Sequence, residues 1–236
     1  MKKTKKLFHT LYEYRVAYVY IAPFFILFCA FNLYPILAGF GLSFFRWNGL
    51  SDKHFIGLQN YMTLLQDGLF WKALQNTLII GILAHIPILL GGLLLAYTLN
   101  AKIIKGENIF KTIYFMPMVT SSVAISIIFM QLFSGNYGMV NYLIRLFGGE
   151  GYNWLGGDGS LIKVVVIVLF AWKWIGWDMV IYLSGMQAIS RDIYEAAMID
   201  GAGHFQTVFR ITIPLLKPII VFTLVQSSIG MFNLFT

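Results

Sequence analysis

The chain of 236 residues is too apolar and too weakly charged for a soluble domain. Hydrophobic residues make up 58% and charged residues 11%, whereas soluble domains average about 45–50% and about 25%. The net charge of +7 does not indicate nucleic acid, because basic residues gather in the cytoplasmic loops of membrane proteins. Composition therefore predicts an integral membrane protein with lipid as its surroundings.

The N-terminal residues resemble the start of a signal peptide but predict a retained span. Lys2, Lys3, Lys5 and Lys6 precede an apolar run over about 16–40. That run is longer than the roughly 7–15 residues of a signal-peptide core.

Five apolar runs are long enough to cross a bilayer, which takes about 20 residues per helix. The predicted fold is an all-α polytopic membrane protein, with 1–236 as a single transmembrane domain. We expect the spans near 16–40, 73–99, 112–133, 161–188 and 218–236. The connection 43–71 is amphipathic and is expected to lie along the membrane surface.

The distribution of Lys and Arg predicts the orientation of these spans. Eleven of these residues lie in the N-terminal tail, in the loop after the second span and in the segment 189–217. The opposite loops hold four, and Lys163 and Lys173 fall within the fourth span. By the positive-inside rule the N-terminus and the segment 189–217 are cytoplasmic.

No constellation of residues indicates catalysis. The four histidines are scattered, and no Cys/His or His/Glu spacing suggests a metal site. The glycine-rich loop 148–159 lacks the Gly-Lys-Ser/Thr that a nucleotide-binding loop requires. We therefore expect no catalytic residues, no metal and no cofactor, and a protein that is not an enzyme.

The fourth span carries unusual chemistry at membrane depth. Its segment 172–178 holds three tryptophans, Lys173 and Asp178. Charges there are costly and should face the bundle interior or water. Trp174, Trp177 and Asp178 share one helical stripe, and aromatic rings with a carboxylate suit a sugar. The alternative is helix packing with an internal ion pair.

The segment 189–217 predicts a helix, a turn and a second helix beside the membrane. Ser190 can cap a helix start, where the dipole also favours Asp192. Gly201 stands where that helix should stop, since glycine accepts a left-handed backbone. A second short helix over 205–212 should then end at Pro214 and Pro218.

This segment also resembles a known family. Glu195-Ala196-Ala197, three residues, Gly201, nine residues and Ile211-x-Ile213-Pro214 are similar to the EAA loop of ABC importer permeases. The family usually has Leu where this chain has Ile213. The stretches 200–203 and 205–206 resemble the carbohydrate branch, the maltose and multiple-sugar permeases, as do 32–35, 57–61 and 76–77.

The resemblance implies a type I importer permease core in the cell membrane, either inner or plasma. Such a subunit forms half of the pathway for a sugar, here expected to be an oligosaccharide. The implied partners are a dimer of ATP-hydrolysing subunits, a second permease subunit and an extracellular or periplasmic sugar-binding protein. The implied coupling residues are Glu195, Ala196, Ala197, Asp200, Gly201, Ile211 and Pro214. The resemblance also adds Asn233 to the pathway residues Trp174, Trp177 and Asp178.

Two other functions remain open. One is a permease of the same family for another solute, such as glycerol phosphate or a polyamine. The other is a secondary transporter or a membrane enzyme, for which Asp178 alone is thin support. Sugar permeases of this family have one further span after the fifth, so the resemblance implies that a sixth helix is missing here.

Overall fold

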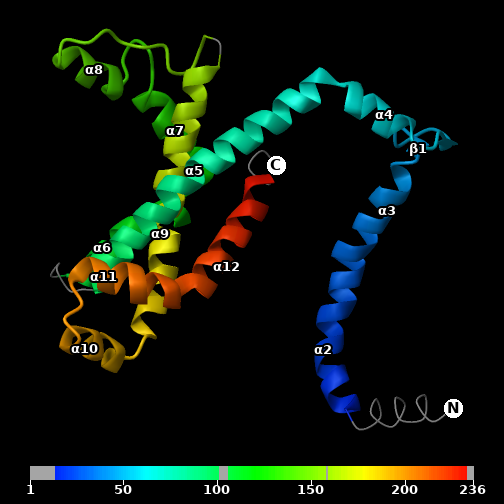
Figure 1. The fold of residues 1–236 in the computed structure, drawn as a ribbon. Coiled ribbons are helices and arrows are strands. Elements are labelled where there is room, and N and C mark those ends of the chain that lie inside the picture. Colours follow the sequence, from blue (N-terminus) through cyan, green and yellow to red (C-terminus); the bar gives the residue numbers. More distant parts are fainter. Residues whose placement is uncertain (1–13, 101–105, 158, 233–236) are drawn as a thin grey trace. The chain divides into compact units, whose positions relative to one another are not determined.

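The computed structural model describes residues 14–100, 106–157 and 159–232, most of which are helical (Figure 1). The chain divides into two compact units, residues 1–72 and 73–236. Each unit is described by itself below.

The described part of the first unit begins with one long apolar helix. It consists of α2 (Arg15–Phe28), a π-helical turn (Cys29–Leu33) and α3 (Tyr34–Leu42), together 28 residues. None of its most apolar stretch is buried, so its side chains need a lipid environment. The first predicted span, 16–40, is thereby confirmed as a helix.

The connection after α3 is a small hairpin followed by a helix. Strand β1 (Phe45–Arg46) pairs antiparallel with β2 (His54–Phe55), Phe45 opposite Phe55. Asn48 turns the chain between them, because its Oδ1 accepts hydrogen bonds from the backbone N–H of Leu50 and Ser51. Helix α4 (Gln59–Gln66) follows.

The second unit is built around one central helix. This is α9 (Ser160–Gln187), against which α6 and α12 pack, and Figure 1 shows it running through the middle of this unit. The other elements are α5 (Gly68–Asn100, which begins in the first unit), α6 (Glu107–Val119), α7 (Ser122–Leu132), α8 (Met139–Leu146), α10 (Arg191–Ile199), α11 (His204–Thr207) and α12 (Ile213–Phe232).

The core of this unit joins three helices at one end of α9. Its buried side chains are Ala96 and Leu99 of α5, Met179, Tyr182, Leu183 and Met186 of α9, and Leu216 of α12. Small residues permit the close approach, as in many membrane helix pairs. A Cβ at Gly176 would collide with the Tyr114 carbonyl of α6, and one at Gly92 would lie 2.9 Å from the Asp178 Cβ.

The predicted third span, 112–133, is not one straight helix in the structure. It is divided into α6 and α7, which meet at an angle of 96°. The break falls at Thr120 and Ser121, whose backbones are extended. Pro117 lies inside α6, which continues to Val119 before this break.

The predicted end of the second helix in segment 189–217 is also wrong. α11 continues through a π-helical turn (Val208–Thr212) directly into α12, and residues 205–232 form one helix of 28 residues. Pro214 and Pro218 therefore lie within a helix. Pro214 occupies the second position of α12, and the extra residue of the π turn shifts the backbone register just before it.

Four helices in the described residues are long and apolar enough to cross a membrane, or five if the bent pair α6–α7 counts as one span. At most 28% of the most apolar stretch in each of the four is buried. Apolar side chains on their outer surfaces are therefore exposed, which agrees with the membrane location predicted from composition.

Candidate functional site

Helix α10 begins as its sequence predicts. The Ser190 hydroxyl accepts a hydrogen bond from the backbone N–H of Asp192 at 3.3 Å. That hydroxyl also donates to the Asp192 carboxylate, which lies in the first turn, where the helix dipole favours a negative charge. The cap and the charge together fix where the helix starts.

The turn after α10 requires glycine. Gly201 has φ +75°, a left-handed backbone. The N–H of Ala202 donates to the Ala197 carbonyl at 2.9 Å and that of Gly201 to the Met198 carbonyl at 3.1 Å. These two bonds form a Schellman motif, which closes the helix end and sets the direction of the following chain. The predicted stop at Gly201 is confirmed.

α10 is held against the helix that follows it. Ala197 and Thr212 are buried on the inner side, and the hydroxyls of Tyr194 and Thr212 are 3.3 Å apart. The Thr212 hydroxyl also donates to the Thr207 carbonyl. Neither Tyr194 nor this pairing could be predicted from the sequence, because no local pattern links residues eighteen positions apart.

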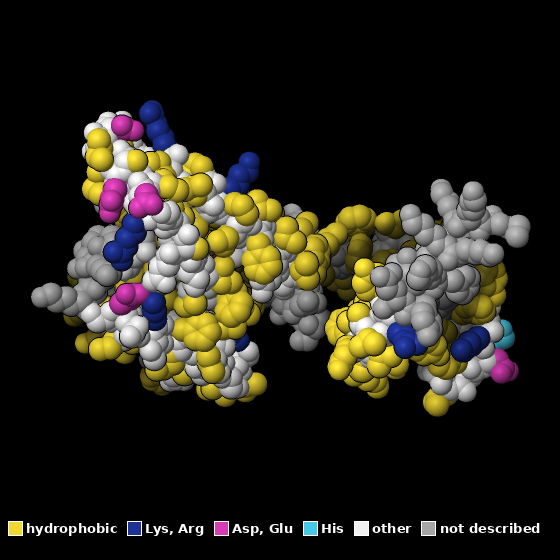
Figure 2. Space-filling model, turned by 90° about the horizontal axis from the view of Figure 1, so that it is seen from below, with side chains coloured by type: hydrophobic (Ala, Val, Ile, Leu, Met, Phe, Trp, Pro, Cys, Tyr) yellow, Lys and Arg dark blue, Asp and Glu magenta, His cyan; other side chains and the backbone are white. Residues whose placement is uncertain are grey.

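The outer surface of this segment mixes charged and apolar side chains. Glu195, Ala196, Asp200 and Gly201 are exposed. The large exposed apolar residues are Ile193, Met198, Ile199, Phe205, Phe209 and Leu215. Figure 2 views the molecule from this end and shows charged side chains of both signs among hydrophobic ones. Of the other two predicted coupling residues, Ile211 is half-buried and Pro214 is exposed.

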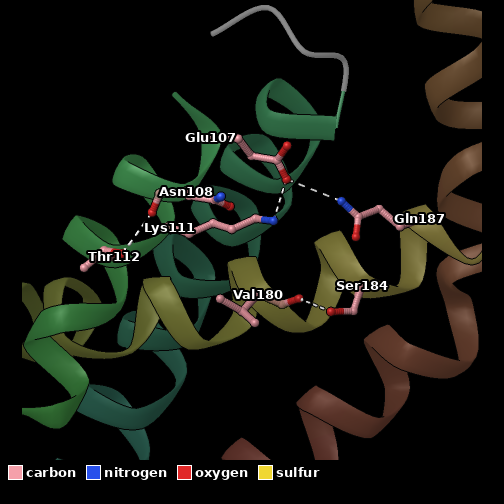
Figure 3. Close-up of polar contacts among 7 residues, drawn as sticks. All are labelled: Glu107, Asn108, Lys111, Thr112, Val180, Ser184 and Gln187. Carbon is pink, nitrogen blue, oxygen red and sulfur yellow. Dashed lines mark hydrogen bonds and ion pairs between the residues drawn. The ribbon is translucent and has the colours of Figure 1, made fainter. Parts of the chain in front are cut away.

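A polar contact joins the end of α9 nearest this segment to α6. The Glu107 carboxylate of α6 is ion-paired with Lys111 and accepts a hydrogen bond from Gln187 of α9 at 3.4 Å. Figure 3 shows Glu107 between the two. Gln187 is the last residue of α9, three positions before Ser190, so α6 contacts the helix that leads into the segment.

The residues of the predicted stripe on α9 contact different helices. Trp177 faces α6, where its ring stacks on Phe115 with centroids 6.3 Å apart. Asp178 faces α5 and is buried beside Gly92, while Trp174 is half-buried. Asn233 lies outside the described residues.

Asp178 belongs to a buried polar cluster. Its carboxylate accepts a hydrogen bond from the Tyr182 hydroxyl at 3.3 Å. That hydroxyl lies 2.6 Å from the hydroxyl of Thr223 on α12. The sequence analysis named neither Tyr182 nor Thr223, although the four-residue spacing of Asp178 and Tyr182 places them on one helix face.

The other charge of α9 is separate from this cluster. Lys173 donates a hydrogen bond to the Ser122 hydroxyl of α7, so it does not form the internal ion pair with Asp178 that was the alternative. His85 of α5 is engaged through Nδ1 by the Gly81 carbonyl at 2.9 Å. Its Nε2 is buried without a hydrogen-bond partner among the described atoms.

Comparison with known proteins places this arrangement among transporters. Residues 88–236 match the family described as "Binding-protein-dependent transport system inner membrane component". The lactose transport system permease protein LacF of Rhizobium radiobacter is 40% identical over 92% of this chain and 73% of its own length. The arabinooligosaccharides transport system permease protein AraP of Bacillus subtilis is 37% identical over 92% and 69%.

The fold has solved counterparts. A bacterial ABC transporter that imports the acidic polysaccharide alginate matches with a TM-score of 0.79 and 25% identity, covering 97% of this chain and 77% of that one. The same kind of transporter in complex with an alginate pentasaccharide-bound periplasmic protein matches with a TM-score of 0.76 and 25% identity, covering 94% and 74%. The chain therefore belongs to the family of binding-protein-dependent transport system inner membrane components.

Proposed function

We propose that the chain is the permease subunit of an ATP-driven sugar importer and forms half of the transmembrane pathway for an oligosaccharide. The observation that carries this proposal is its similarity to permeases named for lactose, arabinooligosaccharides and, at 30% identity, trehalose and maltose in Thermococcus litoralis. The similar alginate transporter imports an acidic polysaccharide. All of these substrates are carbohydrates.

The segment 189–217 is proposed to dock onto a separate ATP-hydrolysing subunit. Its support is the short capped helix α10, closed by a fixed turn and pinned through Tyr194 to the helix that enters the membrane. Such an element moves as a rigid body, whereas a flexible loop would absorb the motion. The segment exposes charged side chains, including Glu195 and Asp200, beside apolar ones. A partner protein typically covers a surface of this kind.

Two further partners complete the proposed complex. A second permease subunit would supply the other half of the pathway, and an extracellular or periplasmic sugar-binding protein would deliver the substrate. The alginate transporter crystallised with a sugar-loaded periplasmic protein supports the second of these. The ATP-hydrolysing dimer would favour one of two bundle conformations at each stage of the cycle.

The sugar pathway is proposed to follow α9, with Trp174, Trp177 and Asp178 contributing, and Asn233 joining from the next span. Indole faces cover the CH groups of a sugar while polar groups bind its hydroxyls. In the isolated subunit Trp177 packs on Phe115 and Asp178 on Tyr182. Contact with sugar would therefore require these packings to open when the bundle changes conformation.

Sugar-stimulated ATP hydrolysis tests the proposed substrate class. The subunit is reconstituted in vesicles with its ATPase, second permease and binding protein. Lactose and arabinooligosaccharides are compared with glycerol 3-phosphate and spermidine. Stimulation by a carbohydrate alone supports the proposal. Stimulation by glycerol phosphate or the polyamine alone would favour the second candidate class, and transport without any ATPase would exclude an ATP-driven importer.

A further inference from the structure

Helix α8 has its apolar face turned away from the protein. Met139, Tyr142, Leu143 and Leu146 share one side of the helix, and 47–65% of each residue's surface is exposed. On the other side Asn141 is completely buried. In a helix packed on a soluble core the apolar side would be the covered one. In α8 the apolar side is instead exposed, so its side chains need an apolar environment that the described residues do not provide.

Asn141 fixes the rotation of α8. Its amide donates hydrogen bonds to the carbonyls of Gly135 and Tyr152, both at 2.8 Å. Its Oδ1 accepts from the Tyr152 backbone N–H at 3.0 Å and from the Trp154 indole N–H at 2.8 Å. All hydrogen-bonding capacity of the amide is satisfied. The helix therefore cannot turn its apolar face inward without breaking four hydrogen bonds.

The partners of Asn141 belong to an aromatic cluster at the end of α7 and beside α9. Phe129 contacts Phe133 and Trp172, Phe133 contacts Trp154, and Trp154 contacts Tyr152, with ring centroids 5.4–5.9 Å apart. Tyr and Trp are enriched where membrane spans meet the headgroup region. Because α8 is hydrogen-bonded to this cluster, a cluster at the membrane boundary would hold α8 at the same depth.

An exposed apolar surface of α7 leads to α8. Val123, Ile127 and Met130 of α7 are exposed, and α8 packs against this helix. Figure 1 shows α8 beside the ends of α7 and α9. The apolar side chains of α8 thus continue the exposed apolar surface of α7, which belongs to an apolar run predicted to cross the membrane. This continuity favours lipid over a protein partner as their cover.

Polar groups gather on the other side of the α8 loop. A cavity of about 500 Å³ is lined there by Ser134, Asn136, Arg145 and Asn153, among others. Arg145 follows Asn141 by four residues and so shares its helix face. The loop is therefore two-sided, with its polar groups opposite the exposed apolar residues of α8.

We propose that α8 is an interfacial helix, lying in the membrane boundary with Met139, Tyr142, Leu143 and Leu146 in the acyl–headgroup region of the bilayer. An amphipathic helix with this division of side chains lies in the plane of the interface. The polar cavity would then face water. This inference depends on the membrane location of the chain and is independent of which solute it transports.

Fluorescence quenching at single cysteines tests this placement. In a Cys29→Ser background, Leu146→Cys or Leu143→Cys is labelled with bimane, and Asn136→Cys serves as the control on the polar side. The full chain is reconstituted in phosphatidylcholine vesicles. A lipid carrying a doxyl group at carbon 5 of its acyl chain quenches from within the boundary, and iodide quenches from water.

We expect bimane at 146 and 143 to emit at shorter wavelength than bimane at 136. The doxyl lipid should quench the labels at 146 and 143 several-fold more than the label at 136. Iodide should quench the label at 136. Equal iodide quenching at all three positions would overturn the proposal. So would a label at 146 that iodide reaches in the isolated subunit and that only the binding protein or second permease protects. Positions 143 and 146 are labelled in separate variants, so if one variant does not fold or label, the other still tests the proposal.

Discussion

At the scale of single residues, Gly201 is the position where side-chain identity most directly controls the proposed coupling segment. Its φ of +75° disfavours any β-branched residue, at a cost of about 1–3 kcal/mol. A Cβ there would meet no atom within 4 Å, so the cost is conformational and not steric. Gly201→Val should therefore disrupt the Schellman turn and reduce sugar-stimulated ATP hydrolysis several-fold in the reconstituted complex.

Gly201→Asn is the matched control for that prediction. Asparagine tolerates the left-handed region, and the open space around the site accepts its side chain. Its ATP hydrolysis should remain near that of the unmodified protein. If Val and Asn behave alike, the left-handed turn has no role in coupling.

Tyr182 is the residue on which the buried polar cluster depends. Its hydroxyl contacts both Asp178 and Thr223, so Tyr182→Phe removes a hydrogen-bond donor from a buried carboxylate. Leaving such a group without its partner costs about 1–3 kcal/mol. The melting temperature in detergent should fall, whereas Tyr20→Phe, at an exposed position, should leave it unchanged. Equal melting of the two variants would show that the cluster adds nothing to stability.

At the scale of helices, α9 and α6 approach closely at Gly176. A methyl group there would collide with the Tyr114 carbonyl and approach the Phe115 backbone nitrogen. Backbone cannot move aside as a side chain can, so Gly176→Ala should destabilise the pair by about 1–3 kcal/mol. Thermal unfolding in detergent measures this.

Gly230→Ala in α12 is the control for the packing of α9 on α6. A Cβ at Gly230 has nothing within 4 Å, and alanine has the higher helix propensity. This variant should melt at or slightly above the temperature of the unmodified protein. A Gly176→Ala variant that melts with it would contradict the close contact with Tyr114.

Helix α9 also carries residues of the proposed sugar pathway. Trp174→Ala and Trp177→Ala should each raise the sugar concentration for half-maximal uptake by about two- to tenfold, since an aromatic contact contributes about 0.5–1.5 kcal/mol. Trp177→Phe should restore most of the affinity by keeping an aromatic face. Trp172→Ala is the control, because that ring belongs to the aromatic cluster near α8.

Loss of helix packing is the competing explanation for an effect at Trp177, which stacks on Phe115. Packing loss would lower the melting temperature and the amount of assembled complex without changing sugar selectivity. Unchanged affinity and selectivity in both alanine variants would show that Trp174 and Trp177 have only a structural role.

At the scale of the whole molecule, the distribution of Lys and Arg predicts which loops face the cytoplasm. The eleven-to-four division predicts that 189–217 lies inside and 134–160 outside. With Cys29 replaced by Ser, cysteines at Glu150 and Gly203 should differ in labelling by an impermeant maleimide in intact cells or spheroplasts. Both positions are exposed, so burial does not confound the comparison.

Glu150→Cys should label before permeabilisation and Gly203→Cys only after it. The reverse result would invert the proposed orientation, and equal labelling of both in intact cells would refute the assignment of these loops to opposite sides.

The apolar helices, the ends of α10 and the family can be predicted from the sequence, because the signals for them are local or compositional. The long apolar helices follow from the number of residues needed to cross a bilayer. The start of α10 follows from Ser190 and Asp192, and its end from Gly201, because these effects act within one helical turn. The residues around Glu195 carry the resemblance to importer permeases, which the family match supports.

Only the tertiary structure decided how the helices meet. The 96° bend between α6 and α7 separates two helices within one apolar run. Hydropathy shows that the run is apolar but does not show where the helix axis changes direction. The pairing of Tyr182 with Thr223 joins residues 41 positions apart, and Trp177 and Asp178, adjacent in sequence, face different helices. Whether Asn141 is buried depends on a loop that folds back over it. Periodicity specifies which residues share a helix face, but the neighbour of that face is set by helix packing across the bundle.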